Sequence, residues 1–151
     1  MSPIAMPTIG MGTFRLHDET ARNAVKSALA VGYRHIDTAQ FYDNETAVGE
    51  GIKASGIPRH DIFLTTKVWF DQLKHDDLIS SLKDSLQKLQ TDQANLVLIH
   101  WPSPNNEVPM EEYLGALREA QNQGLTEHIG VSNFTCVRWT QRSIYWETAL
   151  C

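Results

Sequence analysis

The sequence lacks the features that mark several specialised classes of protein. Its formal net charge is −5, whereas a nucleic-acid-binding domain carries a basic patch or stripe. No run of apolar residues approaches the ~20 that a membrane span requires. Residues 1–14 have no basic segment followed by an apolar run, so no signal peptide is expected. We therefore expect a cytoplasmic protein that binds neither nucleic acid nor a membrane.

Cysteine is scarce and unevenly placed. Cys136 and Cys151 lie far apart without a Cys-x-x-Cys partner, so no metal site is expected. A disulfide between them is open in principle, although nothing indicates an oxidising compartment. Residues 1–135 contain no cysteine, and two of the four tryptophans also follow Thr135. This shift in composition predicts a boundary between residues 1–135 and a tail of different origin, residues 136–151.

Four short apolar runs are typical of parallel strands that are buried on both faces. They cover residues 33–37, 62–68, 95–101 and 128–133, and helical patterns precede each of them. The predicted helices begin near residues 18, 44, 76 and 109, with Asp18 and Asp76 as expected caps. Polar residues near the strand ends recur at positions 37, 67, 100 and 132, at intervals of 30, 33 and 32. One β-α unit is therefore repeated along the chain.

Repeated β-α units form either a doubly wound sheet or a (β/α)₈ barrel of the TIM type. The Gly10-x-Gly12 pair lacks the third glycine and the strand-to-helix context of the dinucleotide fingerprint, which favours the barrel. A complete barrel needs ~200–250 residues and eight strands. We therefore predict an α/β half barrel of about four β/α units, preceded by a small N-terminal hairpin over residues 7–14.

Four polar side chains are expected to meet at one end of this barrel. Asp37, Lys67 and His100 close three successive predicted strands, and Tyr42 follows the first. Each residue has an ordinary structural explanation when it is taken alone. Together they favour a site, because the C-terminal strand ends carry the chemistry of barrels and a buried lysine needs a charged partner such as Asp37.

The chemistry of this set points to a carbonyl. A tyrosine phenol ordinarily titrates near pH ~10, and an ammonium close by favours the phenolate. Tyr42 is therefore suited to protonate an oxygen that gains negative charge, with Asp37 holding Lys67 in place and His100 orienting the oxygen. No spacing supports a zinc site, a P-loop or a Ser/His/Asp triad. Because the four residues include no nucleophile, metal or hydride source, the hydride must come from a reduced nicotinamide.

The same residues resemble the signatures of the aldo-keto reductases. The first signature is matched by residues 32–45, GYRHIDTAQFYDNE, followed by Val48-Gly49. Later landmarks are matched in order by TTKVW, LIHWP and IGVSNF at residues 65–69, 98–102 and 129–134. The similarity runs from about Ile9 to Phe134 and is strongest to bacterial 2,5-diketo-D-gluconate reductases. One departure is Asn95, where the family usually has aspartate, and we expect this change to be tolerated.

The resemblance implies NADPH-dependent reduction of aldehydes or ketones, such as 2,5-diketo-D-gluconate, a related keto sugar or a methylglyoxal-like carbonyl. Tyr42 is then the proton donor, Lys67 and Asp37 tune it, and His100 positions the carbonyl. The resemblance also implies further roles: Ser132 and Asn133 bind the nicotinamide carboxamide, Thr13 and Asp37 lie beside its ribose, and Trp69, Trp101 and His100 line the substrate pocket.

After residue 135 no family motif survives, so the chain resembles a reductase truncated to its N-terminal half. Two functions stay open at this point. The first is a carbonyl reductase, and the second is a non-catalytic fragment or a binding protein of the same fold. Half a barrel also exposes strand edges and apolar surface. Three outcomes stay open: two copies pair, the aromatic residues of the tail cover the open core, or the chain is poorly stable and binds other partners. We favour self-association among them.

Overall fold

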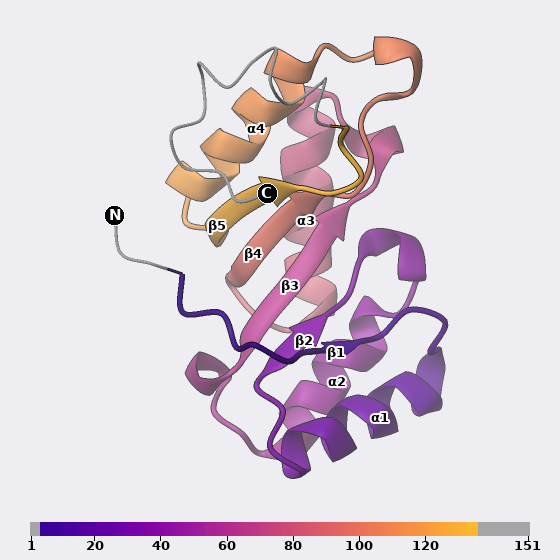
Figure 1. The fold of residues 1–151 in the computed structure, drawn as a ribbon, viewed down its shortest axis with the longest axis vertical. Coiled ribbons are helices and arrows are strands. Elements are labelled where there is room, and N and C mark those ends of the chain that lie inside the picture. Colours follow the sequence, from indigo (N-terminus) through magenta and orange to yellow (C-terminus); the bar gives the residue numbers. More distant parts are fainter. Residues whose placement is uncertain (1–3, 136–151) are drawn as a thin grey trace.

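The computed structural model describes residues 4–135, and these form one parallel sheet of five strands in chain order. The strands are β1 (Met11–Gly12), β2 (His35–Asp37), β3 (Phe63–Val68), β4 (Ala94–Ile99) and β5 (Thr126–Val131). Their register places Asp37 beside Thr65 and Lys67 beside Leu98. Because all the strands run the same way, their carboxyl ends share one edge of the sheet (Figure 1).

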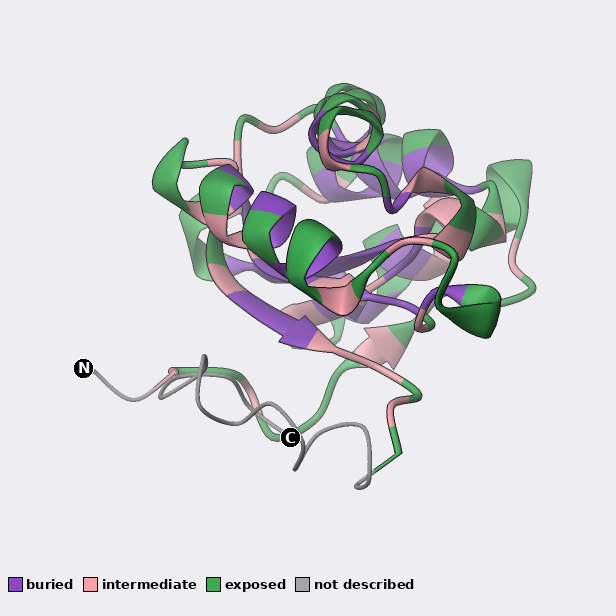
Figure 2. Cartoon of the chain, turned by 90° about the horizontal axis from the view of Figure 1, so that it is seen from above, coloured by how far each residue is buried: buried purple, intermediate pink, exposed green. Residues whose placement is uncertain are grey.

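Each pair of successive strands is joined by one helix. These are α1 (Asp18–Ala30), α2 (Glu45–Ser55), α3 (His75–Lys88) and α4 (Met110–Asn122), with 3-10 turns η1 (Gln40–Tyr42), η2 (Arg59–Asp61), η3 (Phe70–Gln72) and η4 (Pro104–Asn106). The helices lie on one side of the strands, and their buried residues face the sheet (Figure 2). The alternation of strands and helices confirms the predicted β/α architecture with four units.

The core consists of two apolar clusters between the helices and the sheet. One joins α1 and α2 to the first strands and includes Val25, Ile36 and Leu64. The other joins α3 and α4 to the later strands and contains the leucines of α3 at positions 78, 82 and 86. These leucines recur along one face of α3 and pack in the core.

Three of the helices are followed by glycine, whereas the predicted aspartate caps are not found. Gly32, Gly56 and Gly124 follow their helices with φ of 106°, 70° and 77°, a left-handed conformation that suits glycine. The predicted caps are wrong, because Asp18 is the first residue of α1 and Asp76 lies inside the first turn of α3. Carboxylates still favour these positions, since the first turn carries the positive end of the helix dipole.

The N-terminal arm corrects another prediction. Instead of a hairpin over residues 7–14, Met11–Gly12 is a single short strand parallel to β2. Thr13 extends this pairing, because both its backbone N–H and its hydroxyl donate to the carbonyl of Asp37 at 3.0 Å. The described chain therefore contains five strands rather than four.

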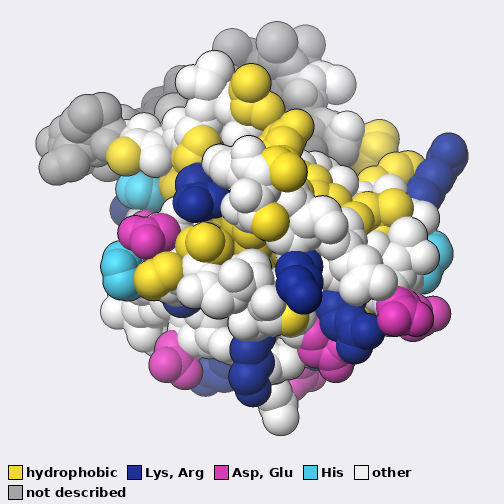
Figure 3. Space-filling model, turned by 90° about the horizontal axis from the view of Figure 1, so that it is seen from below, with side chains coloured by type: hydrophobic (Ala, Val, Ile, Leu, Met, Phe, Trp, Pro, Cys, Tyr) yellow, Lys and Arg dark blue, Asp and Glu magenta, His cyan; other side chains and the backbone are white. Residues whose placement is uncertain are grey.

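The surface mixes both signs of charge where α1 closes the lower end of the molecule. On the face in Figure 3, Lys and Arg side chains lie next to Asp and Glu side chains, with apolar atoms between them. In residues 4–135 no helix is long and apolar enough to span a bilayer. The predicted tail, residues 136–151, lies outside the described part of the chain.

Candidate active site at the strand ends

Lys67 lies near the end of β3 and is 7% exposed. Its Nζ donates to Asp37 Oδ1 at 2.6 Å, to the carbonyl of Thr38 at 3.0 Å and to the hydroxyl of Tyr42 at 3.4 Å. An ammonium has three protons to donate, and here each has an acceptor. The buried cation is therefore fully partnered, as a charge removed from water must be.

Tyr42 is held at the end of η1, directly above β2. Its backbone N–H donates to the carbonyl of Ala39, and Asp43 ends the turn in a left-handed conformation with φ of 49°. The Lys67 ammonium lies 5.1 Å from the Tyr42 ring centre. The ring centres of Phe14 and His100 lie 5.1 and 5.7 Å from it. Aromatic neighbours thus surround the phenol and leave its hydroxyl facing the ammonium.

His100 follows β4 and is 8% exposed. Its ring packs edge-on against Trp69 at 5.0 Å and faces Tyr42 on another side. Burial lowers the pKa of His100 to about 4, and the positive charge of Lys67 acts in the same direction. The imidazole is therefore neutral at pH 7. Its Nδ1 is the one buried side-chain nitrogen or oxygen of residues 4–135 without a hydrogen-bond partner.

The residues expected beside a nicotinamide flank this group on two sides. Asn133 follows β5 with a left-handed φ of 62°, and its Nδ2 donates to the carbonyl of His100 at 2.9 Å and to Ser132 Oγ at 3.1 Å. Thr13 is buried on the opposite side and bonds to the carbonyl of Asp37. The carboxyl ends of the strands thus hold all four residues expected to bind the cofactor, namely Thr13, Asp37, Ser132 and Asn133. Their role with a cofactor stays a prediction.

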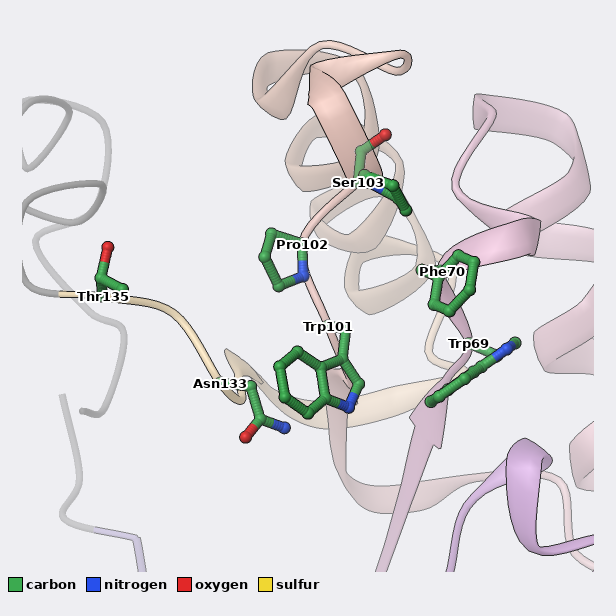
Figure 4. A pocket seen from close by; sticks show the side chains of 8 residues that line it. Trp69, Phe70, Trp101, Pro102, Ser103, Asn133 and Thr135 are labelled. Carbon is green, nitrogen blue, oxygen red and sulfur yellow. The ribbon is translucent and has the colours of Figure 1, made fainter.

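A cavity of about 420 Å³ opens beside this group, between the ends of β3, β4 and β5. Its lining is mostly apolar and consists of Trp69, Phe70, Trp101, Pro102, Ser103, Pro104, Asn133 and Thr135. Figure 4 shows Trp101 between Asn133 and Trp69. Trp69 and Trp101 border this cavity, and their role in binding a substrate stays a prediction. His100 is not among the lining residues, although its ring contacts that of Trp69.

Several neighbours of the site are not predicted from the sequence. Phe41 stacks on Trp69 with ring centres 4.1 Å apart, and Phe14 lies against Tyr42. Gln40 bonds the backbone of Trp69. Their signal in the sequence is weak. Gln40 and Phe41 lie within the first signature, residues 32–45, but neither side chain is ionisable or nucleophilic.

Asn95, the departure from the family pattern, lies near the start of β4, at the far end of the strand from His100. Its Oδ1 accepts from the Leu64 N–H and from Arg59, and its Nδ2 donates to Glu127 Oε2 at 2.9 Å. An aspartate could accept the first two bonds but could not donate the third. The amide therefore suits a partner that is itself a carboxylate.

No cluster of three or more His, Cys, Asp or Glu residues that could hold a metal occurs between residues 4 and 135. The site instead combines the phenol of Tyr42 with the buried ammonium of Lys67, which donates to its hydroxyl.

Comparison with family models matches the aldo/keto reductase family over residues 8–148. The chain is 59% identical over 132 residues to the methylglyoxal reductase DkgB of Escherichia coli O157:H7. The matched segment covers 87% of this chain and 49% of that protein. It is 52% identical over 132 residues to the protein of the same name from Yersinia pestis, again 49% of its length. The chain thus spans about half the length of these curated relatives.

Solved structures show the same likeness. A 2,5-diketo-D-gluconic acid reductase B superposes with a TM-score of 0.87 at 47% identity, over 92% of this chain and 49% of that one. An aldo-keto reductase of Bombyx mori in complex with NADP gives 0.86 at 35% identity, over 95% and 52% of the two chains. These proteins therefore resemble the chain in sequence as well as in fold.

Proposed function

Because the chain belongs to the aldo-keto reductase family, we propose that it reduces an aldehyde or ketone to the alcohol with NADPH as hydride donor. One observation carries the proposal: a single buried ammonium, Lys67, bonds both the carboxylate of Asp37 and the hydroxyl of Tyr42. This arrangement suits proton donation to an oxygen that becomes negative.

Tyr42 is the proposed proton donor. NADPH, when bound, would supply the hydride that the carbonyl carbon accepts. The phenol of Tyr42 gives its proton to the carbonyl oxygen. The two transfers together complete the alcohol and leave a phenolate beside Lys67. The Lys67 ammonium, whose Nζ lies 3.4 Å from the Tyr42 oxygen, provides the positive charge beside which that oxygen becomes negative.

His100 orients the carbonyl in this proposal. A neutral imidazole donates from one ring nitrogen only, so it can hold the carbonyl oxygen without competing with Tyr42 as the acid. The rings of Trp69 and Phe41 support this role, because both pack edge-on against the imidazole and hold its plane.

The donor set at the strand ends fits a nicotinamide. Ser132 and Asn133 offer a hydroxyl and an amide to the carboxamide, and Thr13 and Asp37 lie where the ribose is expected. The Bombyx mori relative was solved with NADP, which supports a phosphorylated nicotinamide cofactor here. The adenosine 2′-phosphate is assigned to no described residue.

The proposed substrate is a small dicarbonyl or keto sugar. Relatives carry the names methylglyoxal reductase and 2,5-diketo-D-gluconic acid reductase. The cavity of about 420 Å³ beside the site supports this proposal, because its volume is typical of small-molecule pockets and Ser103 and Asn133 add polar groups to its mostly apolar walls.

The test follows NADPH consumption with methylglyoxal in the whole chain and in Tyr42→Phe. We expect the variant to lose activity roughly 10²–10⁴-fold, the usual contribution of a positioned general acid. Tyr33→Phe serves as the matched control, because Tyr33 is 37% exposed and precedes β2 at its amino end. Equal turnover by the wild type and Tyr42→Phe would sink the assignment.

A second candidate function is a non-catalytic, self-associating protein of the same fold. The observation in its favour is that β1 and β5 are each paired on one side only within residues 4–135. Such edges present unpaired backbone groups to a partner.

A further inference from the structure

Gln40 lies in η1, two residues before Tyr42, and its side-chain amide joins three segments of the chain. Its Oε1 accepts the backbone N–H of Trp69 at 2.9 Å. Its Nε2 donates to Ser81 Oγ at 3.2 Å and to Ser85 Oγ at 3.1 Å, both in α3. One side chain therefore links the turn that carries the tyrosine, the residue that follows β3 and a core helix.

The direction of each bond requires an amide at this position. The Trp69 N–H must point at an oxygen, which leaves the Gln40 nitrogen for the two serines. Ser81 donates its own proton to the carbonyl of Leu78 at 3.1 Å, and Ser85 bonds to the carboxyl of Glu45. Both hydroxyls are thus free to accept. A carboxylate could not donate to either serine, and an apolar side chain would leave the Trp69 N–H unpaired.

The same bonds continue to the strand that carries Lys67. Glu45 is 3% exposed, and its Oε1 accepts from Thr66 Oγ1 at 2.6 Å. Burial raises the pKa of Glu45. The half-buried Gln40 is therefore linked through Ser85 to the buried Glu45 and Thr66, and Thr66 directly precedes Lys67 in β3. Such a chain of hydrogen bonds favours one arrangement of its members.

Gln40 also lies next to the wall of the cavity proposed for the substrate. Phe41 is the next residue and stacks on Trp69, which borders that cavity. A second recess of about 310 Å³ lies behind the wall, bordered by Gln40, Phe41, Trp69, Asp71, Gln72, Ser81, Asp84, Ser85 and Lys88. The turn and the indole therefore have room to shift once the amide is removed.

We propose that Gln40 is a positioning residue that holds Trp69 and the turn bearing Tyr42 in register with β3 and α3. The inference rests on the carbonyl reduction proposed above and deepens it. Gln40 acts through Trp69 and Tyr42, so its loss moves the pocket wall and the proton donor together.

The first test measures hydrogen exchange of the Trp69 amide by NMR in the whole chain. In Gln40→Ala this amide loses its acceptor, and we expect it to exchange roughly tenfold faster, as the loss of about 1.4 kcal/mol of protection implies. Gln72→Ala is the matched control, since Gln72 borders the same recess from η3 and its change should leave the Trp69 amide unaffected. Unchanged exchange in Gln40→Ala overturns the inference.

The second test uses Gln40→Glu, which keeps the length and the acceptor for Trp69. Its carboxylate cannot donate to the serines and lies near Glu45, but its protonated form restores one donor. We expect kcat/KM for methylglyoxal, relative to wild type, to fall roughly tenfold at pH 8 and to recover toward pH 5.5. A ratio that stays flat with pH would mean a purely structural role and would contradict the inference.

The two failures are distinguishable. A wild-type chain without turnover overturns the proposed function, and the reaction that Gln40 is proposed to serve falls with it. Normal turnover in the wild type with equal turnover in Gln40→Ala and Gln40→Glu overturns the inference alone. If Gln40→Ala does not fold, the pH profile of Gln40→Glu still decides.

Discussion

Lys67 takes all three of its side-chain acceptors from one short segment, residues 37–42. Its charge is therefore tied to the position of the same turn that carries Tyr42. The charged members of this group were predictable from the sequence, because polar residues at the ends of apolar strands stand out. Gln40 and Phe41 were not, since glutamine and phenylalanine are ordinary in a loop and their contacts cross between segments.

His100 should titrate far below an ordinary histidine. Its folded pKa of about 4 lies below the ordinary value of 6.5, so protonation opposes folding. Its contribution to stability is complete above pH 6.5 and is lost as the pH falls toward 4. An NMR titration of the ring protons should give a midpoint near 4. A midpoint near 6.5 would contradict the buried, neutral imidazole described here.

The dependence of stability on pH provides a second check on His100. His100→Gln should flatten the loss of unfolding free energy between pH 6.5 and 4, whereas His17→Gln, at an exposed position, should not. Two other groups with shifted pKa values, His35 and Glu45, are unchanged in both variants, so their contributions cancel in the comparison. Burial lowers the pKa of His35, so its protonation also reduces stability as the pH falls. Burial raises the pKa of Glu45, so its ionisation reduces stability as the pH rises.

Among the side-chain amides, we expect truncation of Asn44 to lower the free energy of unfolding most. It is 3% exposed, its Nδ2 donates to the carbonyls of Thr13 and Leu16, and its Oδ1 accepts from Thr38. Asn44→Ala leaves these groups unpaired, so we expect a loss of about 2–4 kcal/mol in urea unfolding. Asn23→Ala, exposed in α1, is the control. A loss under about 1 kcal/mol for Asn44→Ala would refute the role.

At the scale of elements, the helices were easier to predict than the first strand. Their apolar spacing is a local signal, and it places the start of α2 within a residue of the expected position 44. Met11–Gly12 is too short to show any period, and Gly10 and Gly12 look like a turn. What makes it a strand is pairing with β2, and the sequence of the arm alone does not contain that information.

The packing of α2 against the end of α3 depends on Gly49. A Cβ at this position would lie 2.7 Å from the carbonyl oxygen of Lys88, which is backbone and cannot turn aside. We expect Gly49→Ala to lower the free energy of unfolding by about 1–3 kcal/mol. Gly115→Ala in α4, where a Cβ meets nothing within 4 Å, should instead stabilise by up to about 1 kcal/mol. Equal effects of the two changes would show that the close approach is not limiting.

At the scale of the whole molecule, the described residues place four helices on one side of a sheet with two free edges. The family resemblance identified the barrel type, and the comparisons bear it out. We propose that the free edges and the helix-free face promote association between copies of the chain. Neither feature is local to a motif, so the sequence predicts them only through the fold.

Sedimentation velocity tests this association. We expect the average mass to rise above the 17.0 kDa of one chain as the concentration increases. His128→Lys should reduce the effect, because β5 alternates and Ile129 packs toward the helices, which leaves His128 on the other face of an edge strand. Ser80→Lys, exposed on α3, adds the same charge elsewhere and should change nothing. A constant single-chain mass would rule the association out.

The parallel order of the strands has a consequence for how the site comes into being. Lys67 meets Tyr42 across 25 residues and Asp37 across 30, and Asn133 meets His100 across 33. Each contact spans a single β-α unit, so closing it requires little search by the rest of the chain. During synthesis from the N-terminus, the tyrosine and its lysine can therefore pair as soon as β3 has emerged, and each later unit adds its residue to a group that already exists.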